Sequence, residues 1–213
     1  EGLTLREDWG GKIIRVVKNG ELEHKECFGG NIKGILKKLN YLKSLNVSTI
    51  YLSPLFEGIS NHRYNTADFS KIDSMLGTEQ DFLNLVTKTN EMGINIIMDG
   101  VFNHTGSDSV YFNKYGRYNT VGAFQSKDSK YYNWFKFYEF PEDYACWWGI
   151  KSLPETNDTE KSYVDYICGE NGIIEKYIKL GVDGFRLDVV DELSDEFTDK
   201  ICSRIKKVKK NLL

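Results

Sequence analysis

The sequence predicts an α/β fold in which helices alternate with parallel strands. The spacing of apolar residues marks three helix–strand pairs, at 31–45 with 47–52, at 78–93 with 94–98 and at 172–180 with 182–187. Alternation of this kind implies a parallel sheet with right-handed crossover connections. The chain of 213 residues is long enough for one substantial domain with a single core.

Local signals support each predicted element. In the first helix, Ile32, Ile35, Leu36 and Leu39 recur at helical spacing, and Pro54 stops the strand that follows. The spacing of apolar residues also predicts a last helix over about 193–208.

The second pair has the clearest boundaries. Thr78, with Asp81 three positions on, predicts a capping arrangement at the start of the helix, and Gly93 suits its end. The run Ile94–Met98 is almost continuously apolar, which is typical of a parallel strand buried on both faces.

Polar residues stand where the three predicted strands end: Ser53, Asp99 and Asp188. In (β/α) barrels these ends, with the loops after them, form the active site. No glycine-rich phosphate-binding motif follows any of the strands, so a doubly wound nucleotide-binding sheet has no support. The sequence therefore favours a barrel.

Residues 105–157 break the pattern. This segment is aromatic, polar and irregular, and a long non-periodic segment inside a helix–strand series usually forms a functional excursion or small subdomain. We therefore expect residues 1–104 and 158–213 to build the main domain and residues 105–157 to be inserted into it.

Composition excludes several classes of partner and site. The net charge of −3 argues against nucleic acid, and no apolar run approaches the roughly 18 residues of a membrane span. Four cysteines without a CxxC pair disfavour zinc and predict free, buried thiols in a reducing compartment. A cytoplasmic location is accordingly favoured over secretion.

Two clusters carry reactive side chains. Residues 99–104 bring a carboxylate, an amide and an imidazole out of one strand, although a turn with polar caps explains them equally well. In 184–188, alternation places Arg186 and Asp188 on the same side of a strand, about 7 Å apart along it. The arginine favours the ionised carboxylate that a retaining glycosidase needs as its nucleophile, and the alternative is a structural ion pair.

These clusters resemble the first two conserved regions of the α-amylase family, glycoside hydrolase family 13. Residues 153–157 (Leu-Pro-Glu-Thr-Asn) resemble the motif near the end of the family's inserted B domain. Residues 61–68 look like the loop that carries a sugar-stacking tyrosine. The resemblance implies a partial TIM (β/α)8 barrel, comprising about strands two to four, with residues 105–157 as the B-domain-like insertion.

The resemblance also implies a role for each matched residue. Asp188 would be the nucleophile, Arg186 would keep it ionised and Asp99 would shape the floor of the site. Tyr64 would stack on the sugar, and His104 would bind the sugar in the −1 subsite. Asn103 would support the B-domain loop or ligate calcium.

Glu192, four residues after Asp188, makes the second region similar to that of neopullulanases, cyclomaltodextrinases and maltogenic amylases. It is a candidate substrate-binding residue. This version of the motif disfavours calcium, and no cofactor is expected. The substrate implied is an α-glucan, a maltooligosaccharide or a cyclodextrin. A transglycosylase of the same family and a non-catalytic carbohydrate-binding relative are the alternatives.

The family's general acid lies on the fifth barrel strand, for which this sequence has no match. We therefore expect the 213-residue chain by itself to be inactive. A three-stranded piece of a barrel would also have open edges, through which chains could associate into oligomers.

Overall fold

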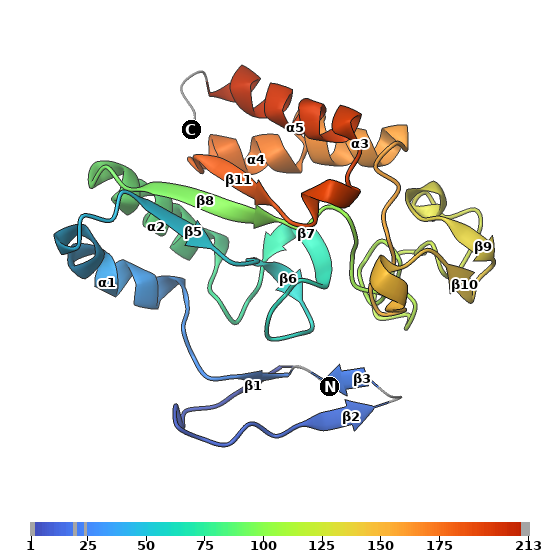
Figure 1. The fold of residues 1–213 in the computed structure, drawn as a ribbon, viewed down its shortest axis with the longest axis horizontal. Helices are drawn as coiled ribbons and strands as arrows, with labels where there is room; N and C mark the ends of the chain where they lie inside the picture. The colour runs from blue at the N-terminus through green and yellow to red at the C-terminus, as the bar shows by residue number, and fades with distance from the viewer. Residues whose placement is uncertain (1–2, 19–20, 24, 210–213) are drawn as a thin grey trace.

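A parallel three-stranded sheet forms the centre of the molecule. The computed structural model describes residues 3–18, 21–23 and 25–209. The strand order is β11-β8-β5, where β5 is Thr49–Leu52, β8 is Asn95–Gly100 and β11 is Gly184–Leu187 (Figure 1). The register sets Tyr51 beside Ile97 and Arg186 beside Asp99. The predicted parallel strands are therefore confirmed.

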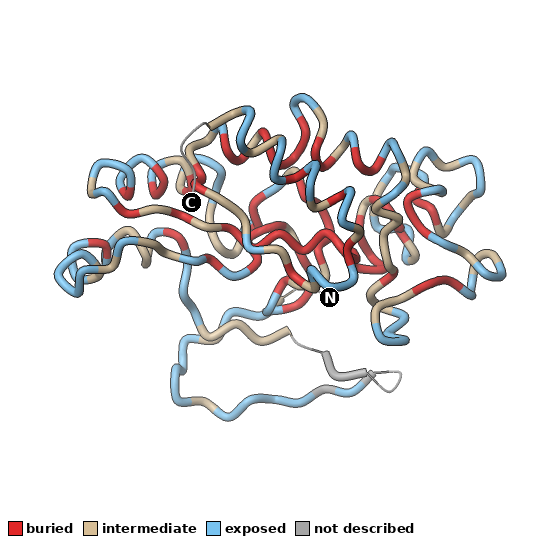
Figure 2. The backbone as a smooth tube through the Cα atoms, turned by 45° about the horizontal axis from the view of Figure 1, so that its top comes forward, coloured by how far each residue is buried: buried red, intermediate tan, exposed pale blue. Residues whose placement is uncertain are grey.

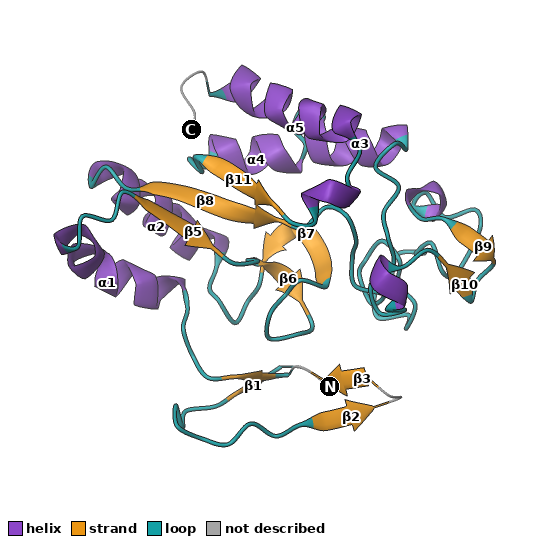
Figure 3. Ribbon diagram, in the orientation of Figure 1, coloured by secondary structure: helices purple, strands orange, loops and turns teal. Residues whose placement is uncertain are grey.

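The predicted helices are present, as α1 (Ile32–Ser44), α2 (Glu79–Glu91), α4 (Ile173–Lys179) and α5 (Asp195–Val208) (Figure 3). The predicted capping box is confirmed, because the Thr78 side chain accepts from the Asp81 N–H and Asp81 accepts from the Thr78 N–H. One helix was missed, α3 (Lys161–Cys168). Its buried residues Tyr163, Val164 and Ile167 do recur at helical spacing, so a signal was present in the sequence.

The sequence also gave no signal for several short elements. Three are antiparallel strand pairs: β6 (Phe56–Gly58) with β7 (Thr66–Ile72), β9 (Phe137–Glu139) with β10 (Asp143–Tyr144), and β2 (Val16–Lys18) with β3 (Glu21–Glu23). One is a parallel pair, β1 (Thr4–Leu5) with β4 (Glu26–Cys27). The others are the 3₁₀ turns η1 (Tyr132–Trp134), η2 (Trp147–Gly149) and η3 (Val190–Glu192). Pairs β9–β10 and turns η1 and η2 lie in the excursion that was expected to be irregular.

The two faces of the sheet differ in burial. Leu52, Ile96 and Met98 point to one face and join a hydrophobic core with the apolar residues of the helices. Tyr51 on the opposite face is 47% exposed, and the Arg186 side chain is 45% exposed. Figure 2 shows the buried segments gathered at the centre of the molecule, with a largely exposed N-terminal segment beside them. The edge strands β5 and β11 are thus open on this face, whereas the central β8 places the half-buried Ile97 and the buried Asp99 there.

The cysteines correct one expectation. All four are free, as predicted, but only Cys168 is buried, and Cys202 is exposed. The reason is the amphipathic pattern of α5, which turns Ile201 into the core and the next residue outward. Among the described residues, no helix has the length and apolar character needed to span a membrane.

We propose that the 213-residue chain associates through its open sheet. Within the part of the chain that the structure describes, β5 and β11 pair with β8 alone, so each has one edge with unpaired backbone groups. Light scattering after size exclusion at micromolar concentration should give a dimer or a larger species. A monomer of 24.6 kDa that melts cooperatively would contradict this expectation.

Candidate active site

Asp99 occupies the end of the central strand β8 and collects three donors. Its side chain is buried. The Tyr64 hydroxyl donates to Oδ2 at 3.0 Å, the Tyr51 hydroxyl donates to the same oxygen, and Arg186 Nη1 donates to Oδ1 at 3.0 Å. All three partners donate, so Asp99 acts only as an acceptor in this arrangement. It links β5, β11 and the loop before β7.

Arg186 bridges Asp99 and Asp188. Its Nη1 lies 2.5 Å from Asp188 Oδ1, which confirms that the two side chains share one side of the strand. Burial lowers the pKa of Arg186, but hydrogen bonds to Asp99 and Asp188 outweigh it and raise that pKa above its usual value. The Arg186 side chain itself is 45% exposed.

Asp188 follows β11 directly and is 9% exposed. Its backbone N–H donates to the Gly100 carbonyl, which keeps it beside the end of β8. The next residue, Val189, has a φ of 49°, a left-handed conformation that a β-branched residue rarely adopts. This turn leads into η3, which carries Glu192. Strained residues of this kind tend to occur at functional sites.

His104 follows β8 by four residues and is 2% exposed. Its Nε2 lies 3.0 Å from the Tyr64 carbonyl oxygen, and its Nδ1 lies 3.2 Å from Asn103 Oδ1. Burial lowers the pKa of His104, and the charge of Asp188 opposes this effect. The ring also stacks on Trp147, with centroids 5.6 Å apart. His104 therefore faces protein groups on both nitrogens and fixes the loop around Tyr64.

Asn103 connects the site to the motif at 153–157. Its carbonyl accepts from the Thr156 N–H, and His104 forms an isolated antiparallel bridge with Glu155. Among residues 3–18, 21–23 and 25–209, no group of three or more His, Cys, Asp and Glu side chains is placed to hold a metal ion. The matched motifs thus converge on the carboxyl ends of parallel strands.

Comparison with known proteins decides the family. The model for "Alpha amylase, catalytic domain" matches residues 7–211. The chain belongs to the alpha-amylase catalytic-domain family. An amylopullulanase of Thermoanaerobacterium saccharolyticum is 46% identical over 203 residues, covering 86% of this chain and 16% of that protein. A cyclomaltodextrinase of Thermoanaerobacter pseudethanolicus is 34% identical over 193 residues, covering 85% and 31%.

Solved structures agree. The type III pullulan hydrolase of Thermococcus kodakarensis superimposes with a TM-score of 0.81 at 29% identity, covering 98% of this chain and 35% of that one. The cyclic α-maltosyl-(1→6)-maltose hydrolase of Arthrobacter globiformis gives a TM-score of 0.80 at 28% identity, covering 94% and 45%. This alpha-amylase family chain therefore spans less than half of each of these relatives.

Three residues that contact the candidate site residues were missed in the sequence: Tyr51, Trp147 and Trp148. Alternation along β5 sets Tyr51 on the opposite face from the buried Leu52, but its place near Asp99 and Arg186 depends on a register that only the structure gives. The tryptophans lie in an irregular loop, where no periodicity indicates where a side chain points.

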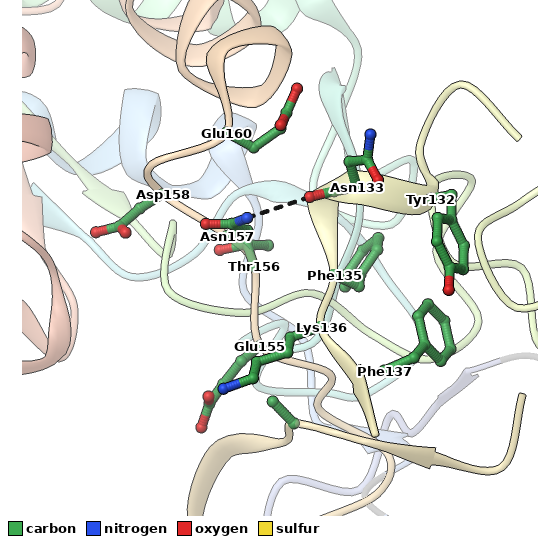
Figure 4. A pocket seen from close by; sticks show the side chains of 11 residues that line it. Tyr132, Asn133, Phe135, Lys136, Phe137, Glu155, Thr156, Asn157, Asp158 and Glu160 are labelled. Carbon is green, nitrogen blue, oxygen red and sulfur yellow. Dashed lines mark hydrogen bonds between the residues drawn. The ribbon is translucent and has the colours of Figure 1, made fainter. Parts of the chain in front are cut away.

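A hollow of about 460 Å³ opens beside the 155–158 segment (Figure 4). It is lined by Tyr132, Asn133, Phe135, Lys136, Phe137, Ala145, Glu155, Thr156, Asn157, Asp158 and Glu160. Asn157 Nδ2 donates to the Asn133 carbonyl at 3.4 Å across it. Burial, followed by the charge of Glu192, raises the pKa of Glu155. The hollow contains none of the paired carboxylates around Arg186, so it is separate from the candidate active site.

Proposed function

We propose that this chain contributes to the active site of a retaining α-glucan hydrolase. The observation that carries the proposal is the pairing of Asp188 with Arg186 Nη1, at 2.5 Å, at the carboxyl end of a parallel strand. An oriented, ionised carboxylate at that place is suited to attack an anomeric carbon. The names of the relatives, an amylopullulanase, a cyclomaltodextrinase and a pullulan hydrolase, support α-glucan substrates such as pullulan and cyclodextrins.

In this proposal an Asp188 carboxylate oxygen forms a bond to the anomeric carbon as the glycosidic bond breaks. A general acid protonates the departing sugar oxygen, and water then hydrolyses the glycosyl–enzyme ester. Arg186 holds the nucleophile, Asp99 holds Arg186 and Tyr64, and Tyr64 stacks on the sugar. His104 and Glu192 are the further candidate contacts of the sugar, and Asn103 supports the loop without a required calcium ion.

The general acid must be a second carboxyl group. Asp99 is a poor candidate, because Tyr51, Tyr64 and Arg186 all donate to it. We propose that the acid belongs to a longer protein that contains this chain. In that protein β5, β8 and β11 would be strands two to four of a TIM barrel, and residues 105–157 would be its B-domain-like insertion. The TM-score of 0.81 with a longer pullulan hydrolase supports this arrangement.

The stereochemistry of the product tests the proposal. Proton NMR of maltooligosaccharide hydrolysis by the longer protein should show the α-anomer first, because two displacements at one carbon retain its configuration. The 213-residue chain alone should release no reducing sugar. A β-anomeric first product would contradict the nucleophilic role of Asp188, and turnover by the chain alone would contradict the separate acid.

A further inference from the structure

We propose that Trp148 is a stacking platform that binds a glucosyl ring of the substrate at the rim of the site, beside Glu192, and thereby sets the preference for longer chains. This inference rests on the proposed function. It adds a binding residue to that function and leaves the chemistry unchanged.

Trp148 is 79% exposed, whereas Trp134 in the same excursion is 4% exposed. A single exposed apolar residue is common and by itself means little. Trp148, however, also has a left-handed backbone, with a φ of 50°. Few residues other than glycine adopt this conformation, which is strained for a residue with a side chain. The surrounding structure therefore holds a large ring in solvent against its backbone preference.

Two contacts fix the orientation of the ring. Trp148 stacks on Trp147 with centroids 5.3 Å apart and planes inclined by 22°. Its Nε1–H donates to Glu192 Oε1 at 3.1 Å. A ring that is already oriented loses little conformational freedom when a ligand binds to it. The indole face is therefore preorganised, and most of its surface stays open to solvent.

The stack leads from the solvent to the buried site. Trp147 lies between Trp148 and His104, and His104 contacts the carbonyl of Tyr64. Glu192 follows Asp188 by four residues, through the strained turn at Val189. A sugar ring on Trp148 would thus lie next to the sugar attacked by Asp188.

The chemistry of this corner fits a hexose. The face of a sugar ring presents C–H groups that pack on an aromatic face, and its hydroxyls find an acceptor in the neighbouring carboxylate. Glu192 and the nearby Glu155 disfavour an anionic ligand. A neutral glucan is therefore favoured over a phosphorylated sugar.

Binding and kinetics test the platform. In the longer protein carrying Asp188→Asn, Trp148→Ala should weaken maltohexaose binding by about tenfold in isothermal titration calorimetry, roughly the loss of one ring contact. Maltose binding should change less than twofold, and Trp148→Phe should recover most of the affinity. Tyr138→Ala is the matched control, because Tyr138 is also exposed, at 63%, but lies on β9.

Kinetics with the catalytic residues intact give the second readout. Trp148→Ala should raise KM for maltohexaose by about tenfold with kcat within twofold. Unchanged maltohexaose binding together with a lower melting temperature would overturn the inference, and would identify Trp148 as a residue covered by another segment or copy. If Asp188→Asn also kept its turnover, the proposed function would fail. If Asp188→Asn lost turnover but Trp148→Ala weakened maltohexaose and maltose binding equally or not at all, only the stacking platform would be refuted.

Discussion

Replacement of Asp188 by asparagine is expected to lower hydrolysis of maltooligosaccharides by about 10⁴-fold or more in the longer protein, as is typical when a nucleophile is removed. Asparagine keeps the shape of the side chain and can still accept a hydrogen bond from Arg186. It cannot form the ester intermediate. Initial rates of reducing-sugar release, with circular dichroism to verify the fold, measure the effect.

Asp191→Asn is the matched control. Asp191 lies in η3, three residues beyond Asp188, and is exposed. Its substitution should leave the rate within about twofold, as expected for a surface change away from the reacting atoms. If Asp188→Asn retained near-normal turnover with an unchanged spectrum, the nucleophile would have to be another residue.

Replacement of Arg186 by alanine should cost about 10²-fold in kcat/KM, as expected when a reacting group loses its fixed position. Arg186 Nη1 is the shared partner of Asp99 and Asp188, so its removal leaves two carboxylates without their cation. Tyr64 still donates to Asp99 in this variant, so part of the site persists.

Arg186→Lys separates charge from shape. The hydrogen bonds from Arg186 to Asp99 and Asp188 all use Nη1, and a lysine ammonium could replace a single contact point but not the planar guanidinium. We expect a rate between those of the alanine variant and the natural protein. Equal rates for the natural protein and the alanine variant would show that the bridge has only a structural role.

The fold could be predicted well where periodicity was strong. Helix α2 has a cap, an apolar face and a terminal glycine, and β8 is a short apolar run, so local signals alone marked both. The hairpin β6–β7 was missed because its strands are unequal and its register shifts, and therefore no simple alternation appears. The open face of the sheet was also unexpected, because an apolar strand does not reveal which elements cover it.

The sequence by itself determined that Arg186 and Asp188 lie on the same side, because side chains two apart in extended backbone share a face. Only the tertiary structure decided that Asp99, 87 residues before Arg186, accepts from the same nitrogen. That contact depends on the register between β8 and β11, which long-range packing sets. The contact of Trp148 with Glu192, 44 residues apart, likewise depends on the path of an irregular loop, and no local periodicity encodes that path.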